Sequence, residues 1–71
     1  MVEMTYVDSS NIEAIGYDAG NMELHIRFIK SSTYVIRGVP QDVYDGLMNA
    51  DSKGSYYNRF IKKNYLDYSK E

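Results

Sequence analysis

Met22-Glu23-Leu24-His25-Ile26-Arg27-Phe28 is the stretch that decides the fold of this 71-residue chain. Apolar and polar side chains alternate strictly along it. Because successive side chains of a strand point to opposite faces of a sheet, this alternation predicts a strand with one face on the core and the other in water. The only histidine of the chain, His25, falls on the polar face, where we expect it to be exposed.

Two further β-rich runs flank this strand and lie close to it in sequence. The sequence predicts strands of about residues 12–18, 22–29 and 33–38. Asp18-Ala19-Gly20-Asn21 forms a turn between the first two, since glycine and asparagine tolerate a positive φ. Lys30-Ser31-Ser32 forms a second tight connection. Such short connections favour an antiparallel meander.

A helix of about residues 41–50 follows the sheet. Pro40 suits a first helical turn, where its missing N–H needs no partner. One apolar stripe at helical spacing is formed by Val39, Val43, Tyr44, Leu47 and Met48. Gly46 inside this helix costs about 1 kcal/mol relative to alanine. We therefore expect close packing against Gly46.

A second helix of about residues 53–64 is predicted to begin after Ser52 as its N-cap. Its packing surface consists of Tyr56, Tyr57, Phe60, Ile61 and Tyr65. Asn58 is a poor helix former, so we expect its side chain to bond the backbone near residues 49–51 or to contact a ligand. The predicted fold class is α+β, a three-stranded antiparallel β-meander followed by two short helices packed on one face. Residues 1–8 are a lead-in, residues 9–68 one domain, and residues 69–71 a C-terminal tail.

Composition argues against several classes of function. The chain has no cysteine and one histidine, which excludes disulfides and the familiar thiolate or multi-histidine metal sites. No nucleophile with a neighbouring base forms a recognisable pattern, so we expect a non-catalytic protein without metal or cofactor. The net charge is −2, but residues 1–51 carry −5 and residues 52–71 carry +3. A local basic surface is therefore expected near the C-terminus.

Hydropathy predicts a cytoplasmic protein with no membrane partner. No apolar run approaches the ~20 residues needed to span a bilayer. The N-terminal residues lack the basic and apolar regions of a signal peptide.

The order and spacing of these residues resemble the KTSC domain, a small module named after the C-terminus of some lysyl-tRNA synthetases and also found as a stand-alone bacterial protein. The resemblance covers about residues 9–68 and rests on Ser9-Ser10, Ile15-Gly16-Tyr17-Asp18, Leu24, Phe28, Tyr34, Val39-Pro40, Val43-Tyr44, Leu47, Ala50, Ser52, Gly54, Tyr56, Asn58, Ile61 and Tyr65. The chain departs from the family pattern at Ile36, where a second tyrosine is usual, and at Ser31, where a glycine is usual. The resemblance implies a binding module, with RNA suggested by the association with the synthetase.

The second predicted helix carries the candidate site for RNA or other single-stranded nucleic acid. Basic side chains there would contact phosphates while tyrosine rings stack on bases. The candidate residues are Lys53, Tyr56, Tyr57, Arg59, Lys62 and Lys63. The alternative is a solvated helix face.

A smaller candidate site lies at the start of the same helix. Ser52, Gly54 and Ser55 could hold an anion at the helix N-terminus, and the alternative is a simple serine cap. The rival function for the whole chain is binding to a protein partner, or homodimerisation, through the sheet face or an edge strand around residues 34–37.

Overall fold

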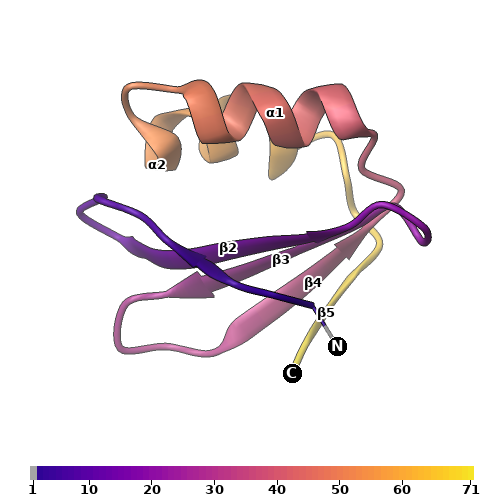
Figure 1. Ribbon diagram of the computed structural model, residues 1–71, viewed down its shortest axis with the longest axis horizontal. Coiled ribbons are helices and arrows are strands. Elements are labelled where there is room, and N and C mark those ends of the chain that lie inside the picture. Colours follow the sequence, from indigo (N-terminus) through magenta and orange to yellow (C-terminus); the bar gives the residue numbers. More distant parts are fainter. Residues whose placement is uncertain (1) are drawn as a thin grey trace.

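The structure is a computed structural model that describes residues 2–71. An antiparallel sheet forms one layer, and the helices lie across one of its faces (Figure 1). The elements in chain order are β1 (Thr5–Tyr6), β2 (Ile12–Asp18), β3 (Glu23–Phe28), β4 (Thr33–Arg37), α1 (Gln41–Asn49), α2 (Lys53–Tyr56), the π-helical turn η1 (Tyr57–Ile61) and β5 (Tyr68–Lys70). The α+β class with two short helical segments on one face is confirmed.

The sheet has five strands in the order β1-β2-β3-β4-β5, so the prediction of a three-stranded sheet is wrong. The predicted meander forms its centre, while β1 comes from the lead-in and β5 comes mostly from the tail. Both added strands are two or three residues long, too short to show an alternating pattern. Backbone bonds flank both pairings, from Val7 N–H to the Glu13 carbonyl (3.1 Å) beside β1 and from Glu71 N–H to the Thr33 carbonyl (2.8 Å) beside β5.

Strand β4 is consequently not an edge, which corrects the expectation of an exposed edge around residues 34–37. Strand β5 pairs along it, with Tyr34 opposite Lys70 and Ile36 opposite Tyr68. The free edge of the sheet on this side belongs to β5, whose three residues are exposed.

The turn between β2 and β3 lies where the sequence predicted it, but the positive φ is not at the glycine or asparagine of the turn, where it was expected. The Asp18 carboxylate accepts hydrogen bonds from the backbone N–H of Asn21 (3.2 Å) and from its side-chain amide (2.8 Å). These bonds hold the pKa of Asp18 below its usual value. The positive φ falls on Met22 (54°), which precedes the strand instead of belonging to it.

The hydrophobic core lies between the helices and one face of the sheet. The predicted alternation of β3 is confirmed, because Leu24 and Ile26 are fully buried there. The core cluster consists of Ile12, Ile15, Leu24, Ile26, Ile36, Val39, Leu47 and Ile61. Among the described residues, no helix has the length and apolar character of a membrane span.

His25 lies on the opposite sheet face, as predicted, but it is not an ordinary exposed histidine. Its side chain retains only 14 % exposure. The Glu71 carboxylate lies 3.2 Å from Nδ1, and the Glu23 carboxylate lies 3.7 Å from Nε2. The sequence could not indicate that His25 is covered, because Glu71 reaches it only by following strand β5, which was not predicted.

Gly46 packs closely against the ring of Tyr56, as expected. A Cβ built at position 46 would overlap the Tyr56 hydroxyl and lie 2.8 Å from its Cζ atom. The glycine in α1 therefore allows the two helices to approach each other.

We expect Gly46→Ala to lower the free energy of unfolding by about 1–3 kcal/mol, because overpacking outweighs the gain in helix propensity. In a Tyr56→Ala background the clash is absent, and the same change should stabilise by about 1 kcal/mol. Urea denaturation of the wild type, the two single variants and the double variant measures this double-mutant cycle. A Gly46→Ala effect that is the same in both backgrounds would contradict this packing.

The second helix starts as predicted but changes its winding after one turn. The Ser52 hydroxyl accepts the Ser55 N–H (3.3 Å), which confirms the serine cap. Residues 53–56 are α-helical, and residues 57–61 then form a π-helical turn, in which the Lys62 N–H bonds the Tyr57 carbonyl (2.8 Å). The regular helix predicted over 53–64 is therefore wrong. Such wide turns occur frequently at functional sites.

Candidate functional site

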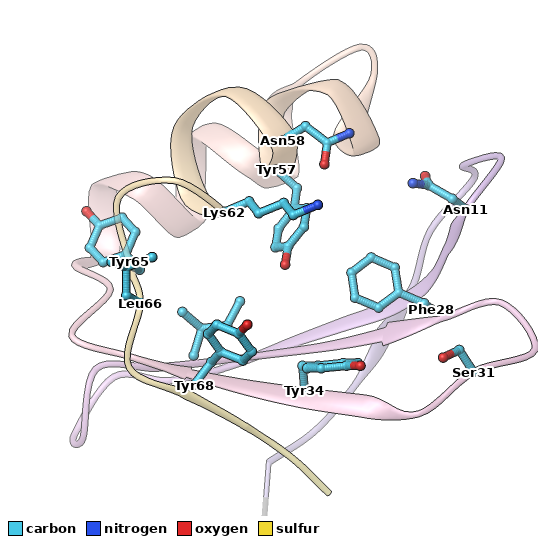
Figure 2. A pocket seen from close by; sticks show the side chains of 11 residues that line it. Asn11, Phe28, Ser31, Tyr34, Tyr57, Asn58, Lys62, Tyr65, Leu66 and Tyr68 are labelled. Atoms are coloured by element: carbon cyan, nitrogen blue, oxygen red, sulfur yellow. The ribbon is translucent and has the colours of Figure 1, made fainter.

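A cavity of about 460 Å³ opens between η1 and the sheet. We call it the aromatic cavity. It is lined by Asn11, Phe28, Ser31, Tyr34, Ile36, Tyr57, Asn58, Lys62, Tyr65, Leu66 and Tyr68. Figure 2 shows Tyr57 reaching into it from the helical side and Tyr34 and Tyr68 lying on the sheet side.

Aromatic rings from three strands and η1 form its wall. Phe28 contacts Tyr34 (centroids 5.8 Å apart) and Tyr57 (5.4 Å), in both cases edge to face. Tyr34 lies 6.2 Å from Tyr68. The register explains this cluster, because β3 pairs Ile26 with Tyr34 and thereby brings Phe28 diagonally beside that tyrosine. The register of the sheet thus places the three rings that the strands contribute to the wall.

Tyr57 is the ring that the helical layer contributes to this wall. Burial raises its pKa above the ordinary value, and the neighbouring Tyr68 and Tyr34 raise it further. The phenol therefore stays protonated in the cavity over the whole neutral range and can donate a hydrogen bond.

This pKa shift predicts a loss of stability in alkali. The pKa of Tyr57 is higher in the folded than in the unfolded protein, so the protonated phenol stabilises the fold. This stabilisation is fully present below the unfolded pKa of about 10 and is lost as pH rises through the folded pKa. The drop in free energy of unfolding between about pH 9 and about pH 11 should be smaller in Tyr57→Phe than in the wild type. Tyr6→Phe serves as the control because Tyr6 is 70 % exposed. A Tyr57→Phe variant that lost stability as the wild type does would contradict the shift.

Polar groups occupy the rim of the aromatic cavity. Asn58 and Lys62 come from the helical side, and Asn11 comes from the segment before β2 (Figure 2). Asn58 is exposed on this rim. In the connection of residues 49–51, where a bond was expected, the Ala50 carbonyl accepts the Lys53 ammonium (3.1 Å). None of the described residues that line the cavity is acidic.

The structure brings together only part of the predicted nucleic-acid site. Tyr57 and Lys62 line the aromatic cavity. Tyr56 packs on the ring of Phe60 (4.8 Å), and the Arg59 guanidinium lies 5.9 Å from that same ring. The remaining predicted residues do not line the cavity either: Lys53 bonds Ala50, and Lys63 is exposed.

The predicted anion site at Ser52, Gly54 and Ser55 sits on the four-residue helix α2. The Ser52 hydroxyl bonds both the N–H and, at 3.1 Å, the hydroxyl of Ser55. Gly54 faces the side chain of Asn11, which a Cβ at position 54 would approach to 2.5 Å. The glycine thus makes room for a residue on the rim of the aromatic cavity.

Sequence reasoning missed Asn11, Phe28, Tyr34 and Tyr68 as site residues. Phe28 and Tyr34 fall on the core face of their strands, so the pattern alone marks them as packing residues. Tyr68 lay outside any predicted element. The two positions that depart from the family pattern, Ile36 (2 % exposed) and Ser31, both line this cavity.

Comparison with known proteins identifies the family. The model of the KTSC domain matches residues 8–65. The chain belongs to the KTSC domain family. This KTSC chain is 40 % identical over 62 residues to a protein from Tsukamurella paurometabola, covering 87 % of this chain and 92 % of that one. It is 31 % identical over 62 residues to an uncharacterised protein from Stutzerimonas stutzeri, covering 87 % of each.

Two further comparisons extend the family assignment of this KTSC chain. A crystal structure of a KTSC domain protein from Yersinia pestis superposes with a TM-score of 0.94 at 37 % identity, covering 100 % of this chain and 99 % of that one. A lysine–tRNA ligase from Nostoc punctiforme is 38 % identical over 55 residues, which are 78 % of this chain and 10 % of the ligase.

Proposed function

We propose that this KTSC chain is a non-catalytic module that binds single-stranded RNA or a related nucleic acid in the aromatic cavity. The observation that carries the proposal is the combination of several aromatic rings with Lys62 and no acidic side chain among the described lining residues. Single-stranded nucleic acids are bound by such surfaces, in which rings stack on bases and cations contact the phosphates.

The size and charge of the aromatic cavity support this ligand class. Its volume of about 460 Å³ falls in the range of small-molecule pockets, so one unstacked base with its sugar is a reasonable occupant. The whole chain has a net charge of −2, but among the described residues that line the cavity only Lys62 is charged. A site of this kind favours one or two nucleotides over an extended duplex.

The match to the Nostoc punctiforme lysine–tRNA ligase adds support of a second kind. By its name, that protein joins lysine to tRNA, and the segment that matches this chain spans 10 % of its length. An appended module with affinity for RNA would suit a protein that handles tRNA.

Two charge reversals on the same helical segment test the proposal. Lys62 lines the aromatic cavity, whereas Arg59 lies over Phe60. We expect Lys62→Glu to weaken binding of a short single-stranded RNA about fivefold and to flatten its salt dependence by about one unit of log–log slope. Arg59→Glu changes the charge equally and should weaken binding less. Fluorescence anisotropy measures both, and equal effects, or no binding by the wild type, would contradict the proposal.

Protein binding is the second candidate function, and one observation favours it. Tyr68, the first residue of the edge strand β5, is 55 % exposed, and Leu66, two residues before it, is 75 % exposed. Homodimerisation through this edge would barely respond to salt and would be weakened by Leu66→Ser. Analytical ultracentrifugation tests it, because a monomer at high concentration would rule the homodimer out.

A further inference from the structure

We infer that Lys70 forms a second phosphate contact beside the aromatic cavity, so that a bound single strand leaves the cavity across β5. The inference rests on the proposed function and adds the direction in which the nucleic acid runs. It follows from the side of the sheet on which each residue of the C-terminal segment lies.

The segment that contains β5 is attached to the sheet through every second side chain. The Arg37 guanidinium donates a hydrogen bond to the Ser69 hydroxyl (2.9 Å) and pairs with the Asp67 carboxylate (3.5 Å). Beyond the end of the strand, the Glu71 carboxylate lies 3.2 Å from Nδ1 of His25. Arg37 and His25 both lie on the sheet face that is turned away from the core. Asp67, Ser69 and Glu71 are therefore held on this far face.

The residues between these attachments lie on the other face. Successive side chains of a strand alternate between faces, so Tyr68 and Lys70 share the face that carries the aromatic cavity. Tyr68 lines the cavity beside Tyr34, which agrees with this placement (Figure 2). In the pairing of β4 with β5, Lys70 is directly opposite Tyr34. Because directly opposite residues are neighbours on one face, Lys70 lies next to the aromatic wall of the cavity.

Lys70 is the charge that β5 presents beside the cavity. Its side chain is exposed, and it forms no ion pair with another residue of the part of the chain that the structure describes. The two acidic residues of the segment, Asp67 and Glu71, pair with Arg37 and His25 on the far face. The segment thus separates its charges, with the carboxylates on one face and the ammonium on the face of the cavity.

The two lysines lie on different sides of the aromatic rings. Lys62 comes from the helical side of the cavity, and Lys70 lies on the sheet side next to Tyr34. Surfaces that bind single strands combine stacking rings with cations that follow the backbone. Each base within a strand has a phosphate on either side, so a base stacked in the cavity brings one phosphate toward each lysine. The bound strand therefore runs from Lys62 over the rings to Lys70.

Two matched charge removals test the inference. Lys70→Gln removes the second contact, and Lys63→Gln makes the same change at an exposed lysine that does not line the cavity. With a labelled hexamer of uridylate at about 0.1 M salt, Lys70→Gln should weaken binding about fivefold and lower the log–log salt slope by about 0.7. Lys63→Gln should leave the affinity and the slope near the wild-type values. Fluorescence anisotropy over a series of salt concentrations measures both quantities.

A third variant separates the charge from the strand that carries it. Lys70→Arg keeps the positive charge and should retain the wild-type slope, and circular dichroism checks that each variant is folded. Equal effects of Lys70→Gln and Lys63→Gln would overturn the inference and leave the proposed function standing. No binding of the hexamer by the wild type would overturn both.

Discussion

Leu47→Ala is expected to lower the free energy of unfolding by about 2–5 kcal/mol. Leu47 is fully buried on α1 and belongs to the core cluster that joins the helices to the sheet. Removing its side chain forfeits its burial and leaves a cavity that the surroundings fill only in part. A domain of 71 residues is stable by roughly 4–10 kcal/mol, so the loss approaches half of the total.

The chain offers a matched control for this prediction. Leu66→Ala makes the same chemical change at a side chain that is 75 % exposed, and it should shift stability by less than about 0.5 kcal/mol. Urea denaturation followed by circular dichroism measures both variants. Comparable losses in the two would contradict the position of the core between α1 and the sheet.

Tyr57→Ala is expected to weaken binding of single-stranded RNA by roughly 5- to 150-fold. Stacking of a base on an aromatic ring is worth about 1–3 kcal/mol when measured by alanine substitution. Tyr57 reaches into the aromatic cavity and contacts Phe28, so its loss removes one stacking surface and loosens another. Fluorescence anisotropy with a labelled oligonucleotide measures the change.

Two further variants separate stacking from general damage. Tyr57→Phe keeps the ring and should retain most of the affinity. Tyr6→Ala removes a tyrosine that is 70 % exposed on β1, outside the aromatic cavity, and should bind as the wild type does. If Tyr57→Ala remained folded and bound RNA with wild-type affinity, the stacking role would be refuted.

The sequence predicted the centre of the fold because that part is encoded locally. The alternation of residues 22–28 and the turn at Asp18 specify two neighbouring strands. The apolar stripe that includes Leu47 specifies the helix α1. Strands β1 and β5 are different. β1 forms by pairing with β2, and β5 forms by pairing with β4. Segments of two or three residues are too short to show the alternation of apolar and polar side chains that marks a strand.

The candidate site was only partly predictable for the same reason. Tyr57 and Lys62 could be named from the basic, tyrosine-rich helix, but the opposite wall depends on the register that places Phe28 beside Tyr34. The π-helical turn of residues 57–61, which directly precedes Lys62, was also not predicted from the sequence. Asn58 stood out as a poor helix former and does line the cavity, but in the connection where its bond was expected the Ala50 carbonyl accepts Lys53 instead.

The central claim is that the aromatic cavity is a nucleic-acid site, and amide chemical-shift mapping tests it most directly. The ¹⁵N-labelled protein is titrated with a short single-stranded RNA at low salt. We expect the largest shifts at Tyr57, Asn58, Lys62, Tyr34 and Asn11, and small shifts around the turn at Asn21, which is not part of the cavity. Shifts confined to surfaces outside the aromatic cavity, or no shifts at all, would contradict the account.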